Sequence, residues 1–325
     1  MTTTMRAIVQ ETYGSADVLE LRDIDQPTAG RGEVLLRVHA AGISRGDVHL
    51  IKGEPYLVRA AVGIRRPKNR VPGQDVAGTV VAIGPDVTRF AVGDEVFGIA
   101  RGSFAEFAVA LEDKLAHKPS VLTFAQAAAM PVSGLTALRA LDAAGVCAGQ
   151  SVLVVGASGG VGTYAVQIAV ASGATVTGVA SAAKAQLVVD LGAVDVIDYA
   201  YEDFADGSRT FDVVLDIGGV TPLARLRRAL TRTGTLVIVG GENGATWSPG
   251  MGRQVHATLL NPFVSQRLTM VMNKEHYSGL ERLAAHAVDG TVASFMDRPY
   301  DLSSTPDAVR HLVAGKVRGK VVITV

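Results

Sequence analysis

SVLVVGASGGVG, residues Ser151–Gly162, is the stretch of this sequence that best indicates its fold. An apolar run opens the stretch, a glycine-rich turn and a helical pattern follow, and a second apolar run covers Ala174–Val179. Such a turn brings backbone N–H groups and a helix N-terminus against a pyrophosphate. Ala157, Gly159 and Gly162 occupy the three glycine places of G-x-G-x-x-G, and the strand–turn–helix–strand context is the one that this motif requires. The segment therefore predicts dinucleotide binding.

The residues around this segment predict a doubly wound parallel sheet preceded by a β-rich region. Apolar and helical patterns alternate after it, as in dinucleotide-binding folds. They predict helices Val161–Ala171, Ala182–Leu191 and Pro222–Leu230, and strands Thr175–Val179, Val194–Ile197, Phe211–Leu215 and Thr235–Val239. Upstream, short apolar runs between Gly, Pro and Asp predict strands, and Thr123–Gln126 has the pattern of a helix capping box. We predict three segments: 1–122, 123–262 and 263–325, the last closing with a strand at Lys320–Thr324.

Composition narrows the class of protein. The 325 residues are 48% hydrophobic and 19% charged, which fits a parallel sheet buried on both faces. Lysine and arginine number 31 and the acids number 31, so the net charge of zero argues against nucleic acid as a partner. The uncharged stretch between Ala143 and Ala183 is interrupted by glycines too often for the roughly 20 apolar residues of a membrane span. Cys147 is the only cysteine, which excludes an intrachain disulfide, and with no signal-like N-terminus we expect a cytoplasmic protein.

Further motifs accompany the glycine-rich turn over nearly the whole chain. They are Ala41-Gly42-Ile43-Ser44-x-x-Asp47, Pro72-Gly73-Gln74-Asp75, Val92-Gly93-Asp94-x-Val96, Gly149-Gln150-x-x-Leu153-x-x-x-Ala157-Ser158-Gly159-Gly160-x-Gly162-x-x-x-x-Gln167, and Arg318-Gly319-Lys320-Val321-Val322. With them the chain resembles the zinc-free quinone oxidoreductase, or zeta-crystallin-like, branch of the medium-chain dehydrogenases/reductases. Val170 departs from that signature, which usually has a basic or small polar residue there.

The resemblance implies a fold and an assembly. Residues 1–122 would form a GroES-like catalytic β domain, 123–262 a Rossmann domain, and 263–325 would return to the catalytic domain. The nicotinamide would lie in the cleft between the domains. A homodimer is expected, with the sheet edge near Thr235–Val239 as its interface.

Zinc is not expected in this chain. Zinc alcohol dehydrogenases of the superfamily have cysteine where Ser44 stands and histidine where Gln74 stands. Zinc sites are built from thiolate, imidazole and carboxylate. We therefore predict a zinc-independent enzyme.

NADPH is the expected cofactor. The second strand of the unit ends Val179-Ala180-Ser181-Ala182-Ala183-Lys184, without the acid that binds the ribose 2′-OH of NAD. By resemblance, Ser181, Lys184 and Tyr199 would hold the 2′-phosphate; as alternatives, they serve as a helix cap, a solvated lysine and a packing aromatic. Other expected cofactor contacts are Thr136, the turn residues Ser158, Gly159, Gly160 and Val161, the strand ends Ile217, Gly218, Gly240 and Gly241, and Lys320, for which a structural role is an equal alternative.

The expected chemistry is hydride transfer to a conjugated carbonyl or quinone, because such acceptors need no strong Lewis acid. Ser44 would donate a hydrogen bond to the substrate oxygen, although relatives often have asparagine there. Asp47 would relay a proton or orient Ser44, or only stabilise a turn, and Tyr56 would donate to the substrate or serve as a rim aromatic. The basic loop Tyr56–Arg70 either attracts an anionic substrate tail or is merely solvated.

The sequence thus predicts an NADPH-dependent reductase of quinones or α,β-unsaturated carbonyls that acts on a small molecule. Two alternatives stay open. One is a zinc-free alcohol dehydrogenase or ketoreductase of a specialised metabolite. The other is a non-enzymatic NADPH-binding protein.

Overall fold

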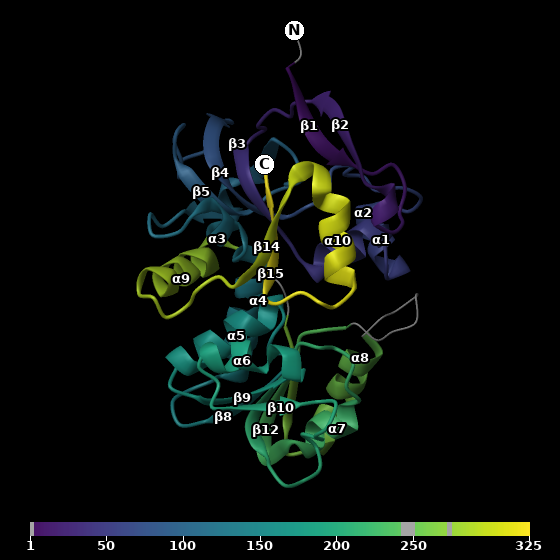
Figure 1. The fold of residues 1–325 in the computed structure, drawn as a ribbon, viewed down its shortest axis with the longest axis vertical. Helices are drawn as coiled ribbons and strands as arrows, with labels where there is room; N and C mark the ends of the chain where they lie inside the picture. Colours follow the sequence, from purple (N-terminus) through teal and green to yellow (C-terminus); the bar gives the residue numbers. More distant parts are fainter. Residues whose placement is uncertain (1–2, 242–250, 272–274) are drawn as a thin grey trace. The chain divides into compact units, whose positions relative to one another are not determined.

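The computed structural model describes residues 3–241, 251–271 and 275–325, which pack as two compact units (Figure 1). The first unit contains the described residues up to 135 together with 275–325, and the second begins at 136. The division falls inside helix α4, Pro131–Ala144. None of the helices in these described ranges is long and apolar enough to cross a membrane. The functional boundaries at 122/123 and 262/263 stay a prediction, because compactness alone does not say which residues bind a cofactor.

A seven-stranded sheet forms the centre of the first unit. Its order is β14-β15-β3-β4-β5-β7, with β6 paired to β3. The strands are β3 Glu33–Ile43, β4 Asp75–Ile83, β5 Glu95–Ile99, β6 Phe107–Leu111, β7 Leu115–His117, β14 Met296–Asp301 and β15 Lys320–Thr324, and a separate hairpin joins β1 Thr4–Val9 to β2 Glu20–Asp25. The closing strand β15 has the predicted bounds and lies antiparallel to β3, with Val321 opposite Ile43. The end of the chain is thereby part of the same sheet as β3 and β4.

Short helices surround this sheet. They are α1 Arg45–Lys52, α2 Arg59–Val62, α3 Phe124–Ala128, α9 Tyr277–Val288 and α10 Thr305–Val313, with 3-10 turns at Ala16–Val18, Tyr56–Val58, Glu112–Lys114 and Leu302–Ser304. The predicted capping box at α3 is confirmed: the Gln126 N–H donates to Thr123 Oγ1 at 3.2 Å, and the Thr123 N–H donates to Gln126 Oε1 at 2.9 Å. Pro131 then begins α4, a position where its missing N–H costs nothing.

The second unit confirms the predicted doubly wound sheet. All of its strand pairs are parallel, in the order β10-β9-β8-β11-β12-β13. The strands are β8 Ser151–Val155, β9 Thr175–Ala180, β10 Asp195–Asp198, β11 Phe211–Asp216, β12 Leu230–Ile238 and β13 Arg267–Met270; the helices are α5 Gly160–Ala171, α6 Ala182–Asp190, α7 Leu223–Arg228 and α8 Met251–Leu260, with a 3-10 turn at Asn261–Phe263. The strand order reverses between β8 and β11, which is where open α/β sheets bind ligands.

Two elements of this unit were not predicted. Neither helix α8 nor strand β13 has a strong pattern of apolar residues in the sequence, and β13 is only four residues long. Strand β13 pairs with β12 through Leu236 and Leu268, so β12 is not a sheet edge. The expectation that Thr235–Val239 forms the sheet edge is therefore wrong, because the last strand on this side of the described sheet is β13. The homodimer itself stays a prediction.

Candidate functional site

Ser44 and Asp47 form a closed hydrogen-bonded pair at the start of α1. Strand β3 ends at Ile43, and Ser44 is the N-cap of the helix. The Ser44 hydroxyl donates to Asp47 Oδ2 at 2.7 Å, and the Ser44 N–H donates to the same oxygen at 2.7 Å. The Asp47 N–H donates back to Ser44 Oγ at 3.3 Å. The structure thus brings these two predicted residues together, in an arrangement that serves both as a helix cap and as a route for a proton.

Asp47 is fully buried, and its acidity is weakened. Burial raises the pKa of its carboxyl group to about 6, and the nearby charge of Asp75 adds to the increase. Hydrogen bonds from Ser44 and the charge of Lys320 act in the opposite direction. Asp47 can therefore exchange a proton close to neutral pH.

Lys320 and Asp75 form a buried ion pair beside this cluster. Lys320 Nζ donates to Asp75 Oδ2 at 2.8 Å, and the Lys320 residue is 2% exposed. The Val132 N–H donates to Asp75 Oδ1 at 2.7 Å, so both carboxylate oxygens have a donor. Burial raises the pKa of Asp75 and the Lys320 ammonium opposes that increase. This geometry supports the structural alternative for Lys320; its contact with a cofactor stays a prediction.

Gln74 connects this cluster to open space. Its Nε2 makes a long hydrogen bond of 3.5 Å to Asp47 Oδ1, and its side chain lines a pocket. Ser44 and Gln74 are the residues at the two expected zinc-ligand places. A hydroxyl, an amide and a carboxylate already bonded to each other do not fit a catalytic zinc. The described part of the chain contains no group of three or more His, Cys, Asp or Glu side chains placed to hold a metal.

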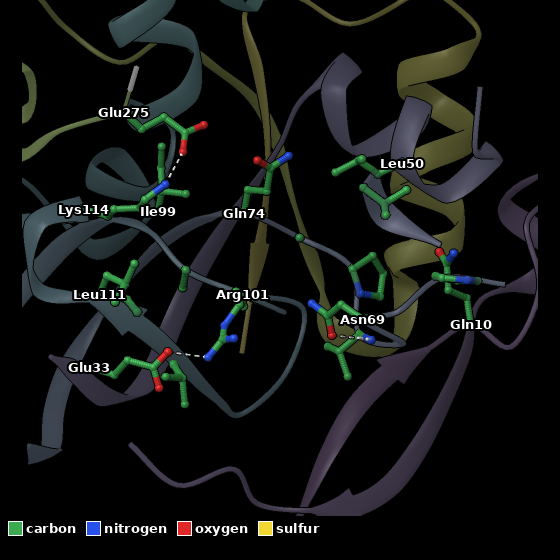
Figure 2. Close-up of a pocket in the computed structure, with 18 residues that line it drawn as sticks. Gln10, Glu33, Leu50, Asn69, Gln74, Ile99, Arg101, Leu111, Lys114 and Glu275 are labelled. Atoms are coloured by element: carbon green, nitrogen blue, oxygen red, sulfur yellow. Dashed lines mark hydrogen bonds and ion pairs between the residues drawn. The ribbon is translucent and has the colours of Figure 1, made fainter. Parts of the chain in front are cut away.

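The pocket beside Gln74 lies entirely within the first unit and has a volume of about 350 Å³ (Figure 2). Its walls are mostly apolar: Leu50, Val62, Pro67, Val71, Pro72, Ile99, Ala100, Val109, Ala110 and Leu111. Two ion pairs also line it, Arg101 with Glu33 at 2.5 Å and Lys114 with Glu275 at 2.9 Å. The remaining lining residues are Gln10, Asn69, Gly73 and Gln74. Because each charge has its counter-charge, the pocket is close to neutral.

Tyr56 and the basic loop lie on the surface of the same unit. Tyr56 is 37% exposed and does not line the pocket; the Arg59 guanidinium stacks on its ring, 4.4 Å from the centroid. Lys68 donates to the carbonyl of Ala61, and Arg70 pairs with Glu11. Arg65 and Arg66 are exposed. Lys68 and Arg70 are exposed too, but they bond to protein groups, as the preceding contacts show.

In the second unit, the glycine-rich turn has the shape of a pyrophosphate cradle. Gly156 has a φ of +91°, and Gly159 is the N-cap of α5, which begins at Gly160. A Cβ at Gly162 would lie 2.2 Å from the carbonyl oxygen of Gly156, so only glycine lets the helix pack so close to the turn. Ser158, 8% exposed, lies in the turn between strand and helix. The first N–H groups of a helix have no partner within it and are available to an anion.

Two further strand ends converge on this turn, as predicted from the sequence. The Gly218 N–H donates to the carbonyl of Val155 at 2.9 Å, directly before the turn. A Cβ at Gly240 would lie 2.2 Å from the carbonyl oxygen of Ile217, so these two strand ends are also in close contact. The predicted Ile217, Gly218 and Gly240 are thus brought together, Gly241 follows them, and Thr136 lies on α4. The absence of a side chain at Gly240 lets these two strand ends lie in close backbone contact.

The expected 2′-phosphate site contains an acid that sequence reasoning missed. Ser181 is the N-cap of α6 and its hydroxyl makes no capping hydrogen bond. The Ala182 N–H donates instead to Asp198 Oδ2 at 3.1 Å, and Asp198 ends the neighbouring strand β10. Tyr199, the next residue, is 65% exposed, and Lys184 lies in the first turn of α6. Strand β10 pairs in parallel with β9, with Ala180 opposite Asp198, and this register places Asp198 beside the end of β9.

Comparisons with known proteins agree with both units. One family model, described as an alcohol dehydrogenase GroES-like domain, matches residues 30–120, and another, described as a zinc-binding dehydrogenase, matches 191–323. The chain is 33% identical to the 2-methylene-furan-3-one reductase of Solanum lycopersicum, over 98% of this chain and 79% of that protein. The solved quinone oxidoreductase of Coxiella burnetii matches with a TM-score of 0.90 and 30% identity, over 99% of this chain and all (100%) of that one. The Escherichia coli quinone oxidoreductase complexed with NADPH matches with a TM-score of 0.84 and 25% identity, with coverage of 99% and 100%.

Proposed function

This chain belongs to the quinone oxidoreductase branch of the medium-chain dehydrogenases/reductases and is an NAD(P)H oxidoreductase of quinone or enone type, and we propose that it uses NADPH, works without zinc, and protonates its product through Ser44 and Asp47. The observation that carries this proposal is the 2.7 Å hydrogen bond from Ser44 Oγ to the buried Asp47 carboxyl group. A hydroxyl and an acid of raised pKa form a two-step proton path.

The protonation state of Asp47 decides what Ser44 can do. When Asp47 is ionised, it accepts the hydroxyl hydrogen of Ser44. When Asp47 is neutral, its own proton can bond to Ser44 Oγ, and the serine hydrogen is then free for the substrate. As charge collects on the substrate oxygen, Ser44 gives that oxygen its proton and takes the proton of Asp47. Each turnover then leaves Asp47 ionised until solvent reprotonates it.

NADPH, when bound, supplies the hydride. The turn residues Ser158–Val161 and the α5 N-terminus would hold its pyrophosphate, and Ile217, Gly218, Gly240 and Gly241 would line its extended path. Ser181, Lys184 and Tyr199 would bind the 2′-phosphate. The support for NADPH over NADH is that β9 itself ends without an acid, leaving a hydroxyl and an ammonium near the ribose.

Zinc-free action is proposed from the donor set. The groups at the expected ligand places are a serine hydroxyl and a glutamine amide, and both already bond to Asp47. Stabilisation of the developing oxyanion is therefore assigned to Ser44 rather than to a Lewis acid.

An anionic group on the substrate is a further part of the proposal. Arg65 and Arg66 are exposed on the basic loop, and three other cations of the loop, Arg59, Lys68 and Arg70, already bond to protein groups. Exposed, uncompensated charge raises the local concentration of an oppositely charged substrate.

We also propose a homodimer, formed by the edge strand β13. An edge strand presents unpaired N–H and C=O groups, which a second copy of the same strand can complete about a two-fold axis. The Val271 N–H donates to Ile238 of β12, so the Met270 N–H, one position earlier, faces the free edge. A Met270→Pro substitution removes that donor, and sedimentation should then show a monomer. A dimer that survives the substitution would place the interface elsewhere.

A cytoplasmic location is likewise proposed, from the single cysteine. Immunodetection in cell fractions tests it, and recovery of the protein in an organelle fraction would contradict it.

The function is tested by turnover of NADPH and of NADH with 2-cyclohexenone and 1,4-benzoquinone, with and without a zinc chelator. We expect reduction that prefers NADPH and ignores the chelator. Ser44→Ala should lower kcat by about 10²- to 10³-fold, the cost of losing one oxyanion donor, and Ser44→Thr should retain most activity. Binding of NADPH without turnover of either acceptor class would contradict the proposal.

A further inference from the structure

Gln10 is a buried hydrogen-bond acceptor without a partner, and it lines the pocket of Figure 2. It follows strand β1, its backbone N–H donates to the carbonyl of Arg70 at 2.8 Å, and the residue is 2% exposed. Its side-chain Oε1 has no hydrogen-bond partner within the described residues. A buried acceptor without a donor is unfavourable, because it has lost its hydrogen bonds to water, and such groups call for a specific explanation. Protein atoms cover this oxygen, so a donor on a bound molecule removes that cost when the Gln10 amide turns its oxygen toward the pocket.

The position of Gln10 relative to the reaction site indicates what such a molecule is. In Figure 2, Gln10 and Leu50 lie on one side of the pocket, Lys114 and Glu275 on the other, and Gln74 between them. Gln74 also bonds to Asp47, so the pocket adjoins the proposed proton path. A molecule whose reacting oxygen is at Ser44 can place its remaining part in the pocket.

We propose that this pocket binds a neutral, apolar substituent of the substrate and that Gln10 accepts a hydrogen bond from a hydroxyl group on it. The inference rests on the proposed function, since it takes the reacting carbonyl to lie at Ser44. A volume of about 350 Å³ is at the lower end of the range for small-molecule pockets, about 300–1,000 Å³. The apolar walls and the two internally paired charges favour an uncharged group. The part of the enone or quinone that this pocket holds is therefore a hydroxylated alkyl or alicyclic side chain.

The acceptor role of Gln10 is tested with paired substrates. Straight-chain alk-3-en-2-ones with and without a terminal hydroxyl are compared in the wild type and in Gln10→Leu, which keeps the size but removes the acceptor. We expect the substitution to lower kcat/KM for the best hydroxylated member by about fivefold to tenfold and to leave that of its alkyl counterpart equal or higher. Equal effects on both members of each pair would overturn this role.

The occupancy of the pocket is tested by filling it. Val62 lines the pocket, whereas Ile64, two residues later, is 75% exposed and does not. Val62→Trp should reduce kcat/KM for long-chain enones at least tenfold and leave 3-buten-2-one unaffected, while Ile64→Trp should change neither. Loss of activity toward the short and long enones alike in Val62→Trp would contradict the assignment.

A binding measurement separates this inference from the proposed function. Ligand-observed NMR with 1-hexanol needs no turnover. Binding should occur in the wild type and in Ile64→Trp, weaken in Gln10→Leu and vanish in Val62→Trp. Unchanged hexanol binding in Val62→Trp overturns the pocket proposal even if enones are reduced, whereas hexanol binding with no reduction of any enone or quinone overturns the proposed function alone.

Discussion

Lys320 Nζ lies 2.8 Å from Asp75 Oδ2 in a pair that is almost fully shielded from water. The pair joins the closing strand β15 to the first residue of β4. Both charges also act on Asp47: Asp75 raises the pKa of its carboxyl group and Lys320 lowers it. The end of the chain therefore contributes to both the stability and the electrostatics of the site.

Removing the ammonium should destabilise the first unit strongly. Lys320→Met leaves Asp75 charged and buried without its counter-ion, and we expect a loss of about 3–5 kcal/mol in the free energy of unfolding. The double variant Lys320→Met/Asp75→Asn should recover most of that loss, because neither partner then carries a charge. Urea denaturation measures both variants. If Lys320→Met is as stable as the wild type, the ion pair contributes little to the free energy of unfolding.

Asp47 should make stability depend on pH. Its pKa is raised from 3.8 to about 6, so its contribution to folding is complete below pH about 4 and is lost as the pH rises through about 6. A shift of this size corresponds to about 3 kcal/mol. Asp47→Asn, which mimics the neutral acid, should therefore gain up to about that much relative to the wild type between pH 4 and pH 8.

The measurement for Asp47 is urea denaturation at both ends of this pH range. Asp23→Asn, at an exposed position on β2, is the matched control for the loss of a carboxyl group. If Asp47→Asn differs from the wild type by the same free energy of unfolding at both pH values, the Asp47 carboxyl group titrates as in the unfolded chain.

Asp198 should limit the affinity for NADPH. Its carboxylate lies at the N-terminus of α6, where a 2′-phosphate would bind, and the two negative charges repel. Asp198→Asn keeps an acceptor for the Ala182 N–H and removes the charge, so kcat/KM for NADPH should rise about threefold to tenfold while that for NADH changes little. Lys184→Gln is the complementary variant and should lower the value for NADPH alone. Equal changes in kcat/KM for NADPH and NADH in Asp198→Asn would show that the 2′-phosphate does not bind beside this residue.

The exposed arginines of the basic loop should act on anionic substrates only. Replacing Arg65 and Arg66 by alanine should raise KM for a carboxylate-bearing enone several-fold at low salt and weaken its dependence on ionic strength. A double replacement of Arg228 and Arg232, exposed in the other unit, is the control and should leave KM unchanged. Steady-state kinetics at two salt concentrations measures these effects. An unaltered KM in the loop variant would show that the loop is solvated and does not attract the substrate.

The sequence predicted those features whose cause is local. Apolar runs, the glycine-rich turn and the Thr123 capping box all depend on neighbouring residues, and each was found with shifts of only a few residues at its ends. The Ser44–Asp47 pair was predicted for the same reason, since the two residues are three positions apart, although the helix that they cap was not predicted.

Features created by pairing across the fold were missed or only partly predicted. Asp75 and Lys320 are 245 positions apart, so their ion pair becomes visible only when β15 lies beside β3. Asp198 reaches α6 because β10 pairs with β9, and no spacing in the sequence shows that register. Nothing in the sequence marks Gln10 as a binding residue, and its proposed role follows from the pocket that it lines.

The pH dependence of kcat for reduction of 2-cyclohexenone at saturating NADPH tests the central claim most directly. If Asp47 supplies the proton through Ser44, kcat of the wild type should be constant below pH about 6 and fall toward tenfold per pH unit above it. Asp47→Asn should be slow at every pH and lose this dependence. A wild-type profile that is flat from pH 5 to 8, with Asp47→Asn as fast as the wild type, would contradict the proton path.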